Sequence, residues 1–220
     1  MLSEHEVEEF ISKYVKNEMV LGIGSNPAGE LFLKKLALRK EQEKLSIKVI
    51  PTSMHMASLL SQLHLPLADL NEDEIDLAIE FVDLADNDYN FVKRDSASFV
   101  RDKMISQGAN ELIIVLEKKN LAKDLHGLIP FEVVPFGWKR TLMQLETYGR
   151  ASIRKKGFSL FKTESGNHVV DVQVDEIFDL HEFELKSKDI PGVIETGLFL
   201  GYADRIVLVN DKIEVKSRMR

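Results

Sequence analysis

Residues 77–83 read Leu-Ala-Ile-Glu-Phe-Val-Asp, a nearly unbroken apolar run that is typical of a strand buried in a parallel sheet. Glu80 lies inside this run, Asp83 ends it, and Asp86 follows three residues later. A buried carboxylate without a partner is strongly unfavourable, so acids at these positions need a structural or chemical reason. Because ligands bind at the carboxyl edge of open α/β sheets, Asp83 and Asp86 are candidates for a site at that edge.

Structural ion pairs are the alternative explanation for these acids, and Lys93 is the obvious partner. Side chains three apart on a strand point to opposite faces, so Glu80 and Asp83 cannot share a face. Ion pairing is the better explanation for Glu80, which lies further back in the strand. Asp83 and Asp86 remain candidates for either role.

The chain up to residue 130 alternates between apolar strands and amphipathic helices. The expected strands cover residues 19–25, 45–50, 77–83 and 111–117. The expected helices cover residues 3–15, opened by a capping box at Ser3 and Glu6, then 28–44, 54–63 and a stretch capped by Ser96 that includes Asp102. This alternation predicts a parallel sheet covered by helices on both faces.

The pattern changes after Pro130. Strands are expected at 131–135, at two runs that form a hairpin about Gly166-Asn167, and at 193–199, with helices at 139–148 and 179–188. This β-α-β-β-α-β order is typical of a ferredoxin-like unit. A final hairpin, 205–209 and 213–216 with a turn at Asn210-Asp211, is expected to rejoin the first sheet. We therefore predict an α/β protein: a Rossmann-like parallel-sheet domain (1–130 plus 200–220) with a smaller ferredoxin-like α+β domain (131–199).

The composition limits the classes of function. A net charge of −7 argues against a general binder of nucleic acids or anionic membranes. The absence of cysteine excludes disulfides, thiolate nucleophiles and cysteine-based metal sites, and the six histidines show no metal-ligand spacing. Acids at positions 4, 6, 8 and 9 argue against a secretory signal, and no apolar run approaches the ~20 residues that span a bilayer. We expect a cytoplasmic protein with no metal, no nucleic-acid partner and no membrane partner.

The pair Gly22-x-Gly24 follows an expected strand and is half of a dinucleotide-binding fingerprint. Pro27 stands where the third glycine of that fingerprint would lie. A phosphate could still bind the backbone N–H groups of this turn and of the following helix, although Pro27 removes one donor. A phosphate or other ligand role and a purely structural role both remain open.

Asp102 lies on an expected helix, bracketed by the apolar residues Phe99 and Ile105. A carboxylate with apolar walls suits a general base that works near neutral pH. A solvated helix face beside Arg101 and Lys103 explains the same spacing equally well.

Four stretches together carry a resemblance to a known family. They are Val-Asp-Leu-Ala-Asp at 82–86 leading to Lys93, Arg-Asp-Lys at 101–103, Pro-Phe-Glu-Val-Val-Pro at 130–135, and Ile-Pro-Gly-Val-Ile-Glu-Thr-Gly-Leu-Phe at 190–199. In these stretches the chain resembles the type A ribose-5-phosphate isomerases, and the last stretch is the most specific. The resemblance implies a Rossmann-like domain with an inserted ferredoxin-like lid. It also implies a homodimer or homotetramer and a cofactor-free interconversion of ribose 5-phosphate and ribulose 5-phosphate.

The resemblance also implies roles for individual residues. Asp102 falls where the family has its glutamate base, and Lys93 falls where a lysine stabilises the enediolate. Asp83 and Asp86 match two aspartates that would orient the substrate or relay protons. The residues expected to bind the sugar phosphate are Gly24, Ser25, Asn26, Ser96 and Lys119.

Two loops depart from the family's pattern. A glycine-rich run after the lysine is replaced by Arg94-Asp95-Ser96, and a Gly-Thr-Gly-Ser-Thr loop has become Gly-Ser-Asn-Pro-Ala at 24–28. Glycines let the backbone approach an anion, and side chains there would crowd it. The competing hypothesis is therefore a non-catalytic or altered-specificity paralogue that binds a sugar phosphate or acts as an interaction module. Retention of the charged positions favours the isomerase.

Overall fold

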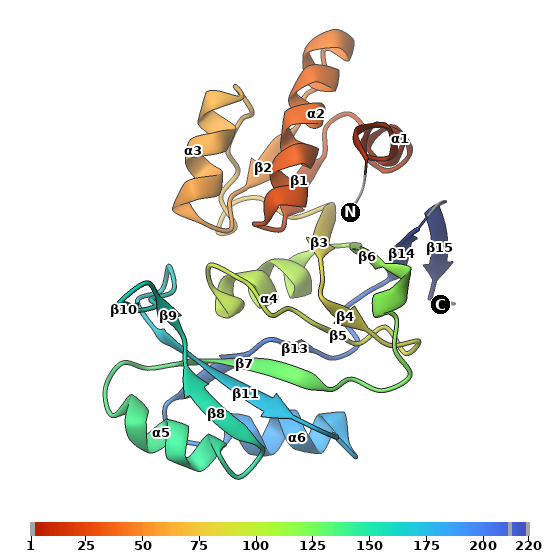
Figure 1. Ribbon diagram of the computed structural model, residues 1–220. Coiled ribbons are helices and arrows are strands. Elements are labelled where there is room, and N and C mark those ends of the chain that lie inside the picture. The colour runs from red at the N-terminus through yellow and green to blue at the C-terminus, as the bar shows by residue number, and fades with distance from the viewer. Residues whose placement is uncertain (1–2, 211–212, 219–220) are drawn as a thin grey trace. The chain divides into compact units, whose positions relative to one another are not determined.

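The computed structural model describes residues 3–210 and 213–218, and its contacts divide the chain into two compact units (Figure 1). Unit 1 comprises Met1–Phe81, Met104–Lys119 and Tyr202–Arg220, and unit 2 comprises Val82–Lys103 and Asn120–Gly201. Compared with the expected division, unit 2 also takes in residues 82–103, 120–130 and 200–201. The α/β class is confirmed, with a mostly parallel sheet in unit 1 and an antiparallel sheet in unit 2.

Unit 1 is built on a six-stranded sheet of order β15-β14-β6-β3-β1-β2. Its strands are β1 Val20–Ile23, β2 Lys48–Ile50, β3 Leu77–Phe81, β6 Leu112–Glu117, β14 Arg205–Val209 and β15 Ile213–Ser217. All neighbouring strands are parallel except β15, which pairs antiparallel with β14 as the expected hairpin. Part of the predicted hairpin turn, Asp211, lies outside the described residues. Nearly every residue of the central strands is buried, as the unbroken apolar runs indicate.

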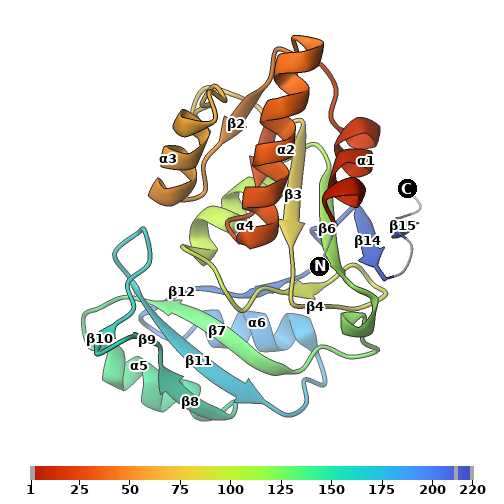
Figure 2. The same ribbon diagram turned by 45° about the horizontal axis from the view of Figure 1, so that its top comes forward.

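The helices of unit 1 are α1 Glu4–Tyr14, α2 Pro27–Glu43, α3 Met54–Gln62 and the second half of α4 Phe99–Gly108. Apolar side chains of α1, α2 and α3 form one core with one face of the sheet, and Figure 2 shows α2 in front of the strands, running alongside β3. On the opposite face, Ile105 of α4 lies against Gly22, and a Cβ on this glycine would overlap the Ile105 side chain. The predicted capping box at Ser3 and Glu6 is confirmed, and Asn26 and Ser53 cap α2 and α3.

Unit 2 contains a four-stranded antiparallel sheet of order β12-β7-β11-β8. Its elements in chain order are β7 Gly127–Val133, α5 Trp138–Leu145, β8 Arg150–Ile153, β11 His168–Val174, α6 Leu180–Lys188 and β12 Val193–Thr196. The predicted β-α-β-β-α-β order of a ferredoxin-like unit is therefore confirmed. Leu145 of α5 and Phe183 of α6 share one core with Phe131 and Val133 of β7, so both helices cover the same face of this sheet (Figure 1).

Three expected elements differ in the structure: two strands are divided, and one hairpin has a longer connection. The expected strand 77–83 ends at Phe81, and β4 Leu84–Ala85 forms a separate sheet with β5 Phe91–Val92 and β13 Leu198–Phe199. The expected strand 193–199 is split between β12 and β13. The strand that pairs with β11 is β8, so the hairpin expected about Gly166-Asn167 has a longer connection, which contains a second small hairpin, β9 Lys155–Lys156 and β10 Ser159–Leu160.

Candidate active site

Asp102 and Lys93 form a buried ion pair in unit 2. Asp102 lies in the first turn of α4 and is 0% exposed. Of the two alternatives for this residue, the solvated helix face is therefore wrong. The Lys93 side chain is also buried, and its Nζ donates to Asp102 Oδ2 at 2.5 Å. A buried carboxylate bound by a buried ammonium is the arrangement that both groups need in a low-dielectric setting.

Ser96 is a third member of this cluster. Its Oγ donates to the same Asp102 Oδ2, also at 2.5 Å, and accepts a hydrogen bond from the Ser98 backbone N–H at 3.0 Å. Asp102 Oδ1 has no hydrogen-bond partner within the part of the chain that the structure describes. The prediction that Ser96 caps α4 is wrong: Ser98 precedes the helix directly, and its Oγ accepts from the Arg101 N–H.

The backbone of Lys93 is held by the stretch that carries the most specific part of the resemblance. The Lys93 N–H donates to the Gly197 carbonyl at 2.8 Å, and the Gly197 N–H donates to the Pro130 carbonyl at 2.8 Å. A Cβ at position 197 would overlap the Lys93 carbonyl oxygen, so only glycine permits this close approach. Next to this contact, the rings of Phe91 and Phe199 are stacked with their centroids 4.5 Å apart.

Asp83 and Asp86 are held by loop backbone. Asp83 Oδ2 accepts from the Arg94 N–H at 2.7 Å. Asp86 is 4% exposed, and its two oxygens accept from the Asp88 N–H and from both the N–H and the side-chain amide of Asn90. Asp83 therefore fixes the loop that follows Lys93, whereas the bonds of Asp86 stay within its own turn.

The side chains that replace the loop glycines are directed to partners of their own. Arg94 donates through Nε to the Leu128 carbonyl and through Nη2 to the His126 carbonyl, both at 3.3 Å. The Asp95 side chain is exposed. Arg154 binds the Arg94 carbonyl at 2.7 Å and pairs with Asp171, so it clamps the loop to the sheet of unit 2.

Lys103, next to Asp102, anchors the start of α4 by a second buried charge. Its Nζ, on a side chain only 6% exposed, lies 2.6 Å from Glu184 and 2.7 Å from Glu195, and it also donates to the Thr196 hydroxyl. Burial raises the pKa of Glu195, but the Lys103 ammonium and the hydrogen bonds that Glu195 accepts outweigh burial and hold this pKa below its usual value. This anchor ties α4 to α6 and β12.

Sequence reasoning missed Glu132, a fully buried acid within β7. Glu132 Oε1 accepts from the Thr163 hydroxyl at 2.8 Å, and Oε2 accepts from the Ser98 hydroxyl and the Val100 N–H, both at 3.3 Å. Its only sequence signal is an acid inside an apolar run, the same anomaly that marks Glu80. Its partners lie 31 to 35 residues away along the chain, so no local pattern could identify them.

The Gly24-Ser25-Asn26 loop lies in unit 1, where β1 leads into α2. Asn26 Oδ1 caps α2 by accepting from the Gly29 N–H at 2.9 Å. A Cβ on Gly29 would overlap the Gly24 carbonyl, so Gly29 provides the close helix–strand packing that the fingerprint's third glycine usually provides. Ser25 Oγ, and Thr52 Oγ1 in the corresponding loop after β2, are buried hydroxyls without a hydrogen-bond partner in the described residues. Two such hydroxyls follow neighbouring parallel strands at the carboxyl edge.

Comparison with known proteins identifies the family. A family model described as ribose 5-phosphate isomerase A (phosphoriboisomerase A) matches residues 48–212. The chain belongs to this family. Ribose-5-phosphate isomerase A 2 of Oceanobacillus iheyensis is 34% identical over 202 residues, which cover 90% of each chain.

Solved structures of family members agree in fold. Ribose 5-phosphate isomerase A from Methanocaldococcus jannaschii matches with a TM-score of 0.89 at 28% identity and covers 98% of each chain. A D-ribose-5-phosphate isomerase in complex with phospho-erythronic acid matches with a TM-score of 0.90 at 26% identity, covering 98% of this chain and 97% of that one.

Lys119 of this ribose 5-phosphate isomerase A family member lies in unit 1, in the short 3-10 helix Lys118–Asn120 that follows β6 and continues into unit 2. Its side chain is 75% exposed, and its Nζ lies 2.5 Å from Glu117. The hydrogen bond from Lys119 is the main cause that lowers the pKa of Glu117 to about 2. The role of Lys119 in substrate binding stays a prediction.

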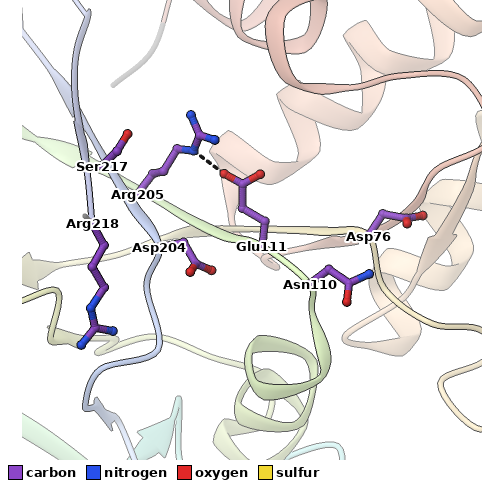
Figure 3. A pocket seen from close by; sticks show the side chains of 7 residues that line it. All are labelled: Asp76, Asn110, Glu111, Asp204, Arg205, Ser217 and Arg218. Carbon is purple, nitrogen blue, oxygen red and sulfur yellow. Dashed lines mark hydrogen bonds and ion pairs between the residues drawn. The ribbon is translucent and has the colours of Figure 1, made fainter. Parts of the chain in front are cut away.

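A cavity of about 540 Å³ lies at the amino edge of the parallel strands of unit 1 (Figure 3). It is lined by Asp76, Asn110, Glu111, Asp204, Arg205, Ser217 and Arg218. Arg205 pairs with Glu111, while Asp76 and Asp204 accept backbone N–H groups at the starts of β1 and β6. These acids therefore stabilise the strand ends, and we assign no ligand to the cavity. Across residues 3–210 and 213–218, no helix has the length and apolar content to cross a membrane.

Proposed function

We propose that this chain interconverts ribose 5-phosphate and ribulose 5-phosphate through an enediolate intermediate. The observation that carries the proposal is the buried Lys93–Asp102 pair, in which Oδ2 is bonded twice and Oδ1 has no partner among the described residues. An acceptor oxygen beside a fixed cation is what abstraction of a proton next to a carbonyl requires. Family membership supplies the substrate class.

The competing hypothesis, a non-catalytic or altered-specificity paralogue, depends on the replaced loop glycines. The guanidinium of Arg94 is bound to the carbonyls of His126 and Leu128, and the Ser96 hydroxyl is bound to Asp102. Because these side chains are bonded to partners within unit 2, their presence does not argue against isomerase activity. The charged pair itself is kept, which supports the enzymatic reading.

Asp102 Oδ1 is buried in the structure, so in the proposed reaction the open-chain aldose must first gain access to it. Oδ1 then takes the C2 proton, and the C2–H bond breaks. Negative charge develops on the enediolate oxygens, where the Lys93 ammonium stabilises it electrostatically. The proton returns from Asp102 to C1, and the hydroxyl proton moves from O2 to O1. Hydrogen is transferred between adjacent carbons without net oxidation, so the reaction needs no redox cofactor.

We assign Asp83 to the orientation of substrate hydroxyls or the relay of the hydroxyl proton. The bond from the Arg94 N–H to its Oδ2 fixes the direction of this carboxylate. Asp86 supports the loop, because three hydrogen bonds from its own turn already occupy its oxygens. In this proposal Asp86 acts on the position of the loop, and its loss affects folding of the loop as well as turnover.

For the sugar phosphate, we propose contacts with Gly24, Ser25 and Asn26, and a further contact with Lys119. The buried Ser25 hydroxyl without a partner supports an anion at this loop, because buried hydroxyls are rarely left unbonded. The start of α2 adds backbone N–H groups and the positive end of the helix dipole. A solved relative is described in complex with phospho-erythronic acid, itself a sugar-acid phosphate.

The test is conversion of ribose 5-phosphate to ribulose 5-phosphate by the purified protein, with Asp102→Asn as the matched control. The amide keeps the shape of the side chain but cannot accept the C2 proton. We expect turnover by the wild type and a loss in the range of ~10²–10⁴-fold in the variant. A wild-type rate no higher than that of Asp102→Asn contradicts the proposed function.

We further propose a homodimer or homotetramer in the cytoplasm. Several large apolar side chains of unit 2 are exposed, which supports association of copies through this unit: Phe136, Met143, Phe158, Phe178, Leu185 and Ile194. Light scattering after size-exclusion chromatography measures the mass directly. A mass equal to the 25.1 kDa of one chain at micromolar concentration contradicts the oligomer.

A further inference from the structure

The two oxygens of the Asp102 carboxylate have different surroundings. Oδ2 accepts from Lys93 Nζ and from Ser96 Oγ, both at 2.5 Å, whereas Oδ1 has no hydrogen-bond partner in the described part of the chain. Because the side chain is 0% exposed, this asymmetry is built into the protein interior. Two donors on Oδ2 fix the plane of the carboxylate and so the direction in which Oδ1 points.

The Ser96 hydroxyl donates its proton to a single acceptor. Ser96 Oγ accepts from the Ser98 N–H at 3.0 Å, and a hydroxyl carries a single proton, which is then donated to Asp102 Oδ2. Ser98 is fixed in turn, because its Oγ bonds Glu132 Oε2 at 3.3 Å. Glu132 is itself buried and bonded by the Thr163 hydroxyl at 2.8 Å. The position of Ser96 is therefore set by the sheet of unit 2.

We propose that Ser96 is a positioning residue: it holds the Asp102 carboxylate by Oδ2 and leaves Oδ1 as the oxygen that accepts the C2 proton. This inference rests on the proposed isomerase function and assigns Ser96 a role other than substrate binding. A base displaced by roughly 1 Å can lose about 100-fold in rate, so fixing the carboxylate matters for catalysis. In this proposal the Ser96 hydroxyl fixes the carboxylate of Asp102, whose side chain is shorter than the glutamate of the family, in a loop where the family has glycines.

The experiment compares Ser96→Ala, Ser96→Thr and the control Ser58→Ala, which removes an exposed hydroxyl from α3. In Ser96→Ala we expect kcat to fall about 10- to 100-fold while the KM for ribose 5-phosphate changes less than about threefold. Ser96→Thr keeps the hydroxyl and is expected to recover at least half of the loss on a logarithmic scale. Ser58→Ala is expected to match the wild type.

One further readout separates positioning from a merely structural role. The isotope effect with ribose 5-phosphate deuterated at C2 increases, because proton abstraction becomes more fully rate-limiting. Circular dichroism verifies folding, and Ser96→Gly replaces Ser96→Ala as the variant without a hydroxyl if the alanine variant does not fold.

Four outcomes contradict the proposal. They are a wild-type rate in folded Ser96→Ala, a loss confined to KM, an unchanged isotope effect, and a loss in folded Ser96→Thr equal to that in Ser96→Ala. A loss confined to KM would make Ser96 a substrate contact. These outcomes are distinct from failure of the isomerase function itself, which appears as absence of turnover in the wild type.

Discussion

The candidate catalytic cluster in unit 2 and the Gly24–Asn26 loop in unit 1 satisfy their polar groups in different ways. In unit 2, Lys93 and Ser96 both donate to Asp102 Oδ2, and Asp102 Oδ1 is left without a partner among the described residues. In unit 1, the buried hydroxyls of Ser25 and Thr52 have no partner there. A preorganised cluster is suited to chemistry, and unbonded hydroxyls at a helix start are suited to an anionic ligand.

The largest effect is expected from substitution of Asp102, the proposed general base of the cluster. Asp102→Asn is expected to lower kcat by ~10³-fold, within the range that general-base catalysis contributes, because the amide cannot take up a proton. Steady-state kinetics with ribose 5-phosphate measure this loss. A variant with more than a tenth of the wild-type kcat would show that another group acts as the base.

Removal of the cation tests how strongly the cluster depends on its own charges. Lys93→Met leaves the Asp102 carboxylate buried beside Ser96 without its ammonium, and we expect a loss of about 3–5 kcal/mol in the free energy of unfolding. Denaturant unfolding at pH 7 measures it. The double variant Lys93→Met/Asp102→Asn removes both charges and is expected to recover most of this stability. An equal loss in the free energy of unfolding for the single and the double variant would contradict a stabilising ion pair between Lys93 and Asp102.

The ion pair of Lys103 with Glu195 in unit 2 is expected to make the free energy of unfolding depend on pH. The pKa of Glu195 is lowered in the folded state relative to 4.5, so its contribution to stability is complete above pH 4.5 and is lost as the pH falls through the lower folded value. Glu195→Gln is expected to reduce the free energy of unfolding by about 1.5–3 kcal/mol at pH 7. The reduction should shrink as the pH is lowered below 4.5. A difference that is constant with pH would exclude this ion pair as its cause.

The smallest expected effect addresses the unit 1 loop. Ser25→Ala is expected to raise the KM for ribose 5-phosphate about tenfold, the equivalent of one hydrogen bond to a charged group, with little change in kcat. Steady-state kinetics separate the two constants. A fall in kcat with an unchanged KM would make this loop part of the chemistry and would remove the contrast between the two regions.

Much of the fold could be predicted from local sequence. Alternating strands and helices predicted the parallel sheet, and the order after Pro130 predicted the ferredoxin-like unit, because both follow from periodicity and turn residues. The breaks after Phe81 and at Gly197 were missed, because they follow from tertiary packing. The Lys93 backbone, for example, approaches Gly197 from more than 100 residues away in sequence.

The site was predictable in part, and for a different reason. Residue types and the family resemblance pointed to Lys93 and Asp102, but helical spacing could not decide whether Asp102 is solvated. The buried face of α4 carries Asp102, Lys103 and Ser106 beside Phe99 and Ile105, so the helix has no clear apolar stripe. The bonds of Ser96 to Asp102 and of Glu132 to Ser98 depend on tertiary placement of a loop, which no local pattern encodes.

The most direct test of proton abstraction by Asp102 uses ribose 5-phosphate deuterated at C2 and follows the label by deuterium NMR. We expect the wild type to remove the label from C2 as ribulose 5-phosphate appears. In Asp102→Asn the label should remain at C2 over the same period. Persistence of the label with the wild type, or its loss from Asp102→Asn at the wild-type rate, would contradict proton abstraction by Asp102.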